Sequence, residues 1–272
     1  MHLSIIIANY NGEVFLKDCL ESINTHCATF SHEVILVDNN SQDNSLALVE
    51  KLSAPIKVIK NDENVGFSKA NNIGVKASSG HNVLLLNNDT ILCGNITAAL
   101  DVLKDEKVGV VGIKMLGRNK EYRKSAGNFP SVWNLIKLSR MMKTNGSFSN
   151  GNFEEELYSV DWVEGSFLLT KRKYWDMVGG LSEEYFMYCE DVDFCKKIND
   201  KNLNTLFYSA ISYIHFGGYT SARSKTINES FKKYARKHMT QPKKSLYLML
   251  LKLKQVQRLS LIHISEPTRQ SL

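Results

Sequence analysis

The chain has 272 residues, of which 43% are hydrophobic and 23% charged, and its net charge is +6. This composition is typical of a globular protein, and 10% aromatic residues with only four prolines exclude a largely disordered chain. The five cysteines are scattered without a C-x-x-C pair, which favours reduced thiols in a cytoplasmic protein over a disulfide framework or a zinc site. The apolar run at 3–8 is too short for a signal-peptide core, and no run approaches the roughly 18 residues of a membrane-spanning helix.

The first half alternates buried strands with amphipathic helices. Short apolar runs predict strands at 3–10, 33–38, 56–61, 82–89 and 108–114. Helical spacing of apolar residues between these runs predicts helices at 13–24, 41–52, 66–79 and around 95–104. Repeated β-α-β units of this kind predict an α/β protein with a mostly parallel sheet flanked by helices.

Polar residues end three of these strands, at Asn9–Tyr10, Asp38 and Asp89. The carboxyl ends of parallel strands share one edge of a sheet, where ligands bind, so we expect these groups to converge. The first turn carries the single Gly12, not the glycine-rich turn of a dinucleotide-binding domain or a P-loop. If the ligand carries phosphates, a divalent metal at Asp89 is therefore the expected neutralising group.

The second half is less regular. A loop-rich insertion is predicted over 115–160, with one helix near 131–142 and a mobile polar segment near 143–156. A later helix begins with Glu190, Asp191 and Asp193, and a pair of short strands at 204–218 carries His215. We expect Asp193 only to offset the dipole of its helix.

Six segments together resemble the family 2 glycosyltransferases in order and spacing, especially the bacterial rhamnosyltransferase-like group that builds O-antigen and other surface polysaccharides. The segments are "SIIIANYNGEVFLKDCLESI", "EVILVDNNSQDNS", "NVGFSKANNIGVKASSGHNVLLLNNDT", "WVEGSFLL", "FMYCEDVDFCKKI" and "IHFGG". The resemblance covers roughly residues 3–220. It implies a GT-A fold, a nucleoside-diphosphate-sugar donor (a dTDP-sugar or a UDP-sugar), Mg²⁺ or Mn²⁺, and a single displacement that inverts the anomeric centre.

The resemblance also implies a role for individual residues. The residues implied to bind the donor are Asn9, Tyr10, Asn11, Asp38, Gly66, Lys69, Asn71 and Asn88. Asn9, Tyr10 and Asn11 would line the base and ribose, Asp38 would accept hydrogen bonds from them, and Lys69 would contact a phosphate.

The metal, sugar and catalytic roles fall on the later motifs. Asn87-Asn88-Asp89 occupies the D-x-D position with asparagine in place of the first acid, which leaves Asp89 and His215 as the implied metal ligands. Asp191 would be the catalytic base that accepts the proton of the acceptor hydroxyl. The sugar and acceptor would contact Trp162, Glu164, Gly165 and Glu190.

The segment 232–258 contains seven lysines, two arginines and no acidic residue around an apolar stretch. This pattern fits either a solvated helix or peripheral attachment to an anionic membrane surface at the inner face of the cell membrane. No recognised nucleic-acid motif accompanies the charge, so no nucleic acid partner is expected. The predicted organisation is a GT-A domain at 1–228 (a nucleotide-binding half, 1–114, and an acceptor and catalytic half, 115–228), a basic amphipathic extension at 229–258 and a non-native tail at 259–272.

The predicted function is inverting transfer of a sugar, with rhamnose favoured, to a glycan or lipid-linked acceptor in surface polysaccharide synthesis. Two alternatives stay open from the sequence. One is transfer of another hexose from a UDP-sugar, and the other is a catalytically weak GT-A module that binds nucleotide or glycan as a scaffold. The acceptor, the linkage and the oligomeric state are not predicted.

Overall fold

The computed structural model describes residues 3–52, 55–136, 142–144, 146–217 and 221–253. The strands are β1 (Leu3–Asn9), β2 (His32–Asp38), β3 (Ile56–Lys60), β4 (Asn82–Leu86), β5 (Thr90–Leu92), β6 (Val108–Leu116), β7 (Tyr122–Arg123), β8 (Ala126–Gly127), β9 (Leu157–Val160), β10 (Trp162–Val163), β11 (Phe167–Lys171) and β12 (Asn204–His215). The helices are α1 (Glu13–His26), α2 (Ser45–Glu50), α3 (Phe67–Lys76), α4 (Thr97–Val102), α5 (Val132–Ile136), the short 3₁₀ helix η2 (Gly146–Phe148), α6 (Arg172–Val178), α7 (Glu190–Asn199) and α8 (Ser221–His238). Residues 243–253 are also helical.

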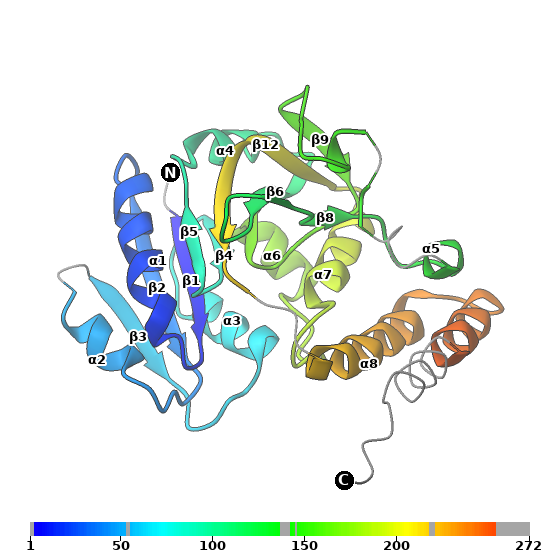
Figure 1. Ribbon diagram of the computed structural model, residues 1–272, viewed down its shortest axis with the longest axis horizontal. Coiled ribbons are helices and arrows are strands. Elements are labelled where there is room, and N and C mark those ends of the chain that lie inside the picture. The colour runs from blue at the N-terminus through cyan, green and yellow to red at the C-terminus, as the bar shows by residue number, and fades with distance from the viewer. Residues whose placement is uncertain (1–2, 53–54, 137–141, 145, 218–220, 254–272) are drawn as a thin grey trace, which may run out of the picture.

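One large mixed sheet forms the centre of the molecule (Figure 1), with the strand order β3-β2-β1-β4-β11-β6-β12-β5. The first four strands in this order are parallel, as the β-α-β pattern predicts. Strand β11 then lies antiparallel between β4 and β6, and β12 runs parallel to β6. The antiparallel insertion of β11 belongs to the irregular second half and has no counterpart in the predicted elements.

Helices cover both faces of this sheet because successive strand residues point to opposite sides. On one face, Ile5 and Ile7 of β1 pack in a core with residues of α1, α2 and α4. On the other face, Ile6 packs in a second core with residues of α3, α6 and α7. Both cores are fully buried at β1, which explains why its sequence is a continuous apolar run rather than an alternating one.

Two predicted elements of the second half differ from the structure. The predicted pair of short strands at 204–218 is the single strand β12, which has a register shift between Tyr208 and Ser212. Its first part pairs with β9 and its last part with β5, so it continues through the irregularity. The helix predicted near 131–142 corresponds to α5 over the residues that the structure describes, and residues 137–141 lie outside them.

The basic C-terminal segment packs against the rest of the protein, and helix α8 runs through the boundary predicted between 228 and 229. Tyr247 and Leu251 of the last helical stretch are buried with Leu135 of α5 and Ala235 of α8. Figure 1 shows α5 beside these C-terminal helices. No helix in the described part of the chain is long and apolar enough to span a bilayer. The predicted tail at 259–272 lies outside the described residues.

Candidate active site

A hydrogen-bond network connects the carboxyl ends of three neighbouring parallel strands. Asn9 ends the middle strand β1 and donates from Nδ2 to Asp38 Oδ1 (2.8 Å) at the end of β2. On its other side, the Oδ1 atom of Asn9 accepts a hydrogen bond from Asn88 Nδ2 (2.7 Å) just after β4. Asp38 also accepts hydrogen bonds from the backbone and hydroxyl groups of Ser41, and only 1% of it is exposed. Asp38 therefore stabilises this edge of the sheet, and its predicted contact with the base or ribose stays a prediction.

Strand pairing brings Asp89 and His215 together although 126 positions separate them in the chain. Strand β5 follows Asp89 directly and pairs antiparallel with the end of β12, so that Thr90 lies opposite His215. The Phe216 amide then donates to the Asp89 carbonyl (3.0 Å), and His215 Nε2 lies 3.2 Å from Asp89 Oδ1. The two predicted metal ligands are therefore adjacent.

The groups around this pair fit a divalent cation. The amide oxygen of Asn87 is buried without a hydrogen-bond partner, and the amide nitrogen of the same side chain lies 3.3 Å from His215 Nε2. A carboxylate, an imidazole and an unpaired amide oxygen are ligands that Mg²⁺ and Mn²⁺ accept while keeping positions for water or phosphate oxygens. Within the described ranges, no three His, Cys, Asp or Glu side chains could hold a metal ion by themselves. Substrate oxygens would complete the coordination.

The absence of a side chain at Gly217 leaves space beside Asp89 and His215. A Cβ atom at Gly217 would lie 2.8 Å from His215 Nε2 and 3.4 Å from Asp89 Oδ2. Any side chain there would press on the two implied ligands, which gives a physical reason for glycine in the "IHFGG" segment.

The helix α7 presents Asp191 and Glu190 at its first turn. The carboxylate of Asp191 accepts hydrogen bonds from the backbone amides of Gly165 (2.9 Å) and Val192 (2.8 Å), which fix its orientation. Glu190 is 5% exposed, and its Oε2 atom has no hydrogen-bond partner. Burial and the neighbouring charge of Asp191 raise the pKa of Glu190 well above its usual range, which favours the protonated form of this carboxyl.

A cavity of about 440 Å³ is lined by all of the predicted metal, sugar and catalytic residues. Among its lining residues are Asn87, Asp89, Trp162, Glu164, Gly165, Glu190, Asp191 and His215. Within this lining, Glu164 Oε1 lies 3.5 Å from His215 Nδ1, and the next residue, Gly165, donates its amide to Asp191. The structure therefore places the predicted base and the predicted metal pair in one cavity.

The predicted donor-binding residues lie outside that lining. Tyr10 is half exposed, Asn11 is exposed with a positive φ of 52°, and Lys69 is exposed on the first turn of α3. Asn71 is buried and donates to the Phe67 carbonyl (2.9 Å). Their roles toward the nucleotide remain predictions.

The backbone conformation at Gly66 explains why this residue is a glycine, because its φ is 84°. Its amide donates a hydrogen bond to Asn64 Oδ1 (3.0 Å). A Cβ atom at this position would lie 2.6 Å from the Phe186 carbonyl oxygen. The absent side chain lets the loop before α7 approach the start of α3, and the Phe67 amide donates to that same carbonyl (2.8 Å).

Sequence reasoning missed an apolar wall of the cavity. Ile227 and Phe231 from α8 line it together with Phe67, Met142 and Met187. Ile227, Phe231 and Tyr234 recur at helical spacing in an otherwise polar helix, which is the signal that could have indicated a buried face of α8.

Comparison with known proteins defines the class of this chain. The family described as "Glycosyl transferase family 2" matches residues 4–163, more than half of the sequence. The chain belongs to this family of glycosyltransferases.

Two relatives and one solved structure illustrate the similarity. The chain is 27% identical over 225 residues to the rhamnosyltransferase WbbL of Escherichia coli (strain K12), which covers 78% of this chain and 82% of that relative. It is 25% identical over 213 residues to an N-acetylglucosaminyl-diphospho-decaprenol L-rhamnosyltransferase of Mycobacterium tuberculosis, covering 70% and 68%. The mannosyltransferase PcManGT of Pyrobaculum calidifontis, solved with GDP-Man and Mn²⁺, matches with a TM-score of 0.62 at 15% identity over 98% of this chain and 76% of that one. The predicted GT-A fold is confirmed by this likeness.

Proposed function

We propose that this protein transfers a sugar, with rhamnose favoured, from a nucleoside-diphosphate sugar to a hydroxyl group of a glycan or lipid-linked acceptor, with inversion at the anomeric carbon. The observation that carries the proposal is that one cavity holds Asp191 together with the pair Asp89 and His215. A base for the acceptor and a cation site for the diphosphate are the two groups that such a displacement needs.

Asp191 acts on the acceptor. Its carboxylate, oriented by the amides of Gly165 and Val192, takes the proton of the acceptor hydroxyl while that oxygen bonds to the anomeric carbon. The bond from this carbon to the diphosphate oxygen breaks, and its electron pair leaves with the nucleoside diphosphate. Attack on the face opposite the leaving group inverts the configuration. In its protonated form, which the raised pKa favours, Glu190 would donate a hydrogen bond to a sugar oxygen beside the base.

Asp89, His215 and Asn87 act on the leaving group. A divalent cation held by these residues would neutralise the negative charge that develops on the departing diphosphate. His215 is oriented on its other ring nitrogen by Glu164 at 3.5 Å. Exposed Lys69 remains the proposed second cation for a phosphate, since it lies on the first turn of α3.

Rhamnose is favoured because the two relatives described above bear rhamnosyltransferase names at 25–27% identity over most of the chain. The corresponding donor would be a dTDP-sugar, with a UDP-sugar as the alternative. The mycobacterial relative's name specifies a lipid-linked acceptor, and the apolar wall of Ile227 and Phe231 offers a surface for the apolar part of such a molecule.

A donor panel tests this proposal. The thermal midpoint of the purified protein should rise with one nucleotide-sugar in the presence of Mn²⁺ and rise less with chelator, because ligand binding to the native state stabilises it. That donor should then release its nucleoside diphosphate when an acceptor is added. Binding of a donor without any release or transfer would instead support the alternative of a catalytically weak scaffold.

The C-terminal helices are proposed to hold the protein at an anionic membrane surface. Leu246, Met249 and Leu253 are each 43–53% exposed and share one face of the helix, opposite buried Tyr247 and Leu251. The buried face fixes the helix to the domain, so the exposed apolar face has a defined direction. Nine positive charges in 232–258 add roughly 1 kcal/mol for each charge that reaches an anionic surface.

Replacing Leu246, Met249 and Leu253 together by glutamine should abolish most co-sedimentation with anionic vesicles, because both apolar insertion and charge are needed for firm attachment. Wild-type binding should also weaken steeply as salt is raised. The matched control replaces exposed Val14 and Met177 by glutamine and should pellet like wild type. Equal pelleting of the triple variant and wild type would rule this surface out.

A further inference from the structure

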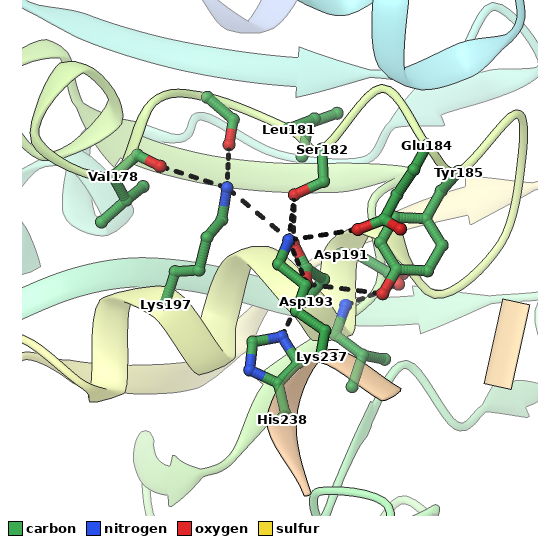
Figure 2. Close-up of polar contacts among 12 residues, drawn as sticks. Val178, Leu181, Ser182, Glu184, Tyr185, Asp191, Asp193, Lys197, Lys237 and His238 are labelled. Atoms are coloured by element: carbon green, nitrogen blue, oxygen red, sulfur yellow. Dashed lines mark hydrogen bonds and ion pairs between the residues drawn. The ribbon is translucent and has the colours of Figure 1, made fainter. Parts of the chain in front are cut away.

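A buried polar cluster lies behind the first turn of α7, outside the cavity lining, and the mechanism above gives it no role. It consists of Asp193 of α7, Ser182 of the preceding loop, and Lys237 and His238 at the end of α8 (Figure 2). We call it the Asp193 cluster. The sequence suggests only a helix-dipole role for Asp193, and the structure corrects this, because the side chain is fully buried.

Asp193 is an ionised carboxylate in this cluster. Its oxygens accept hydrogen bonds from His238 Nε2 (2.6 Å), Ser182 Oγ (2.6 Å) and Lys237 Nζ (3.1 Å). Burial raises the pKa of Asp193, but these three hydrogen bonds outweigh burial and lower it to about 2. Tyr185 Oη donates a longer hydrogen bond to Asp193 (3.4 Å), and Lys197 Nζ lies 3.8 Å from it. A buried charge that is paired and hydrogen-bonded in this way joins its partners firmly.

The geometry of α7 places Asp193 behind Asp191. Residues two positions apart are separated by about 200° around a helix, so they point in nearly opposite directions. Asp191 lines the cavity, while Asp193 contacts the end of α8. A displacement of Asp193 by its contacts with α8 therefore also moves the helical turn that carries the Asp191 carboxylate.

The loop before α7 depends on the same helix. Tyr188 and Cys189 immediately precede Glu190 with φ values of 70° and 73°, a conformation that is costly for residues other than glycine. From α8, Ser230 Oγ donates to the Met187 carbonyl (3.1 Å) and Lys237 Nζ donates to Ser182 Oγ (2.6 Å). Helix α8 thus holds both the strained loop and the helix turn that follows it.

We infer that Asp193 is a positioning residue, which joins α8 to α7 so that Asp191 is held where it can take the acceptor proton. This inference rests on the proposed function. It makes α8 part of the transfer machinery, whereas the sequence places most of this helix in an extension after the catalytic domain.

The first test compares four variants of the full chain. His238→Ala and Asp193→Asn should each lower kcat roughly 10- to 100-fold, the cost of a small misplacement of a reacting group, and leave the donor KM within about twofold. His238→Gln keeps a donor near the position of Nε2 and should recover most of the loss. The matched control is Arg236→Ala, which removes an exposed cation two positions before His238 on α8. This variant should behave like wild type.

Two further readouts separate positioning from general stability. The double variant Asp193→Asn/His238→Ala should be no slower than the worse single variant, because both changes break one unit. Backbone amides at 186–192 should exchange hydrogen faster in His238→Ala than in Arg236→Ala, with wild-type exchange in His238→Gln. This exchange measurement needs no turnover, so it tests the Asp193 cluster even if the protein transfers no sugar. Absence of sugar transfer would contradict the proposed function and not the role of the cluster. Unchanged exchange at 186–192, or a kcat for His238→Ala within twofold of wild type in an active enzyme, would overturn the inference.

Discussion

Replacing Asp191 by asparagine is expected to lower kcat by roughly 10² to 10⁴-fold, the range for removal of a general base. The dissociation constant of the donor should change little, because Asp191 acts on the acceptor hydroxyl rather than on the nucleotide. Asparagine preserves the size of the side chain, but its single carbonyl oxygen can accept only one of the two hydrogen bonds, because Gly165 and Val192 donate to different oxygens of the Asp191 carboxylate. Steady-state kinetics at saturating acceptor and calorimetric donor binding measure the two quantities.

The control for this variant is Asp200→Asn, at the other end of the same helix. Asp200 forms an exposed ion pair with Lys196, and pairs of this kind contribute little to stability. Its kinetics should match wild type. Near-normal turnover of Asp191→Asn at saturating acceptor would show that another group takes the proton.

Replacing Asp89 by alanine is expected to weaken donor binding by more than about tenfold, since a metal at the diphosphate supplies several kcal/mol of charge stabilisation. His215→Ala should act in the same direction with a smaller effect, because the carboxylate carries the charge. Chelation of the wild-type protein should have the effect of the Asp89 variant, and added Mn²⁺ should restore binding to the wild type but not to that variant.

The matched control is Asp101→Ala, which removes an exposed carboxylate paired with Lys104. Its donor affinity and its response to chelator should equal those of wild type. Full activity of the wild-type protein in excess chelator would contradict the metal role of Asp89 and His215, and Lys69 would then be the remaining candidate for the phosphates.

The first half of the fold could be predicted because each element there is encoded locally. Apolar runs such as 3–10 and 82–89 correspond to β1 and β4, and the parallel pairing of β1 with β2 and β4 follows from the helices between them. The convergence of Asn9, Asp38 and Asn88 is a direct consequence of that pairing.

The second half depends on contacts between distant segments, which periodicity does not reveal. Asp89 meets His215 only because β5 pairs with the end of β12, and the resemblance to a family, not the spacing, indicated that pair. The environment of Asp193 also depends on a distant segment, whereas its position in "EDVD" indicates only a charged helix start. Its burial depends on Lys237 and His238, more than 40 residues later, and no local signal encodes that contact.

The most direct test of the account is the product formed from the donor that stabilises the protein, with Mn²⁺ and a glycan or lipid-diphosphate acceptor analogue. Mass spectrometry should detect one added sugar, and nuclear magnetic resonance should show an anomeric configuration opposite to that of the donor. Asp191→Asn should form almost none of this product under the same conditions. A product with retained configuration, or equal product from wild type and Asp191→Asn, would contradict a single displacement with Asp191 as its base.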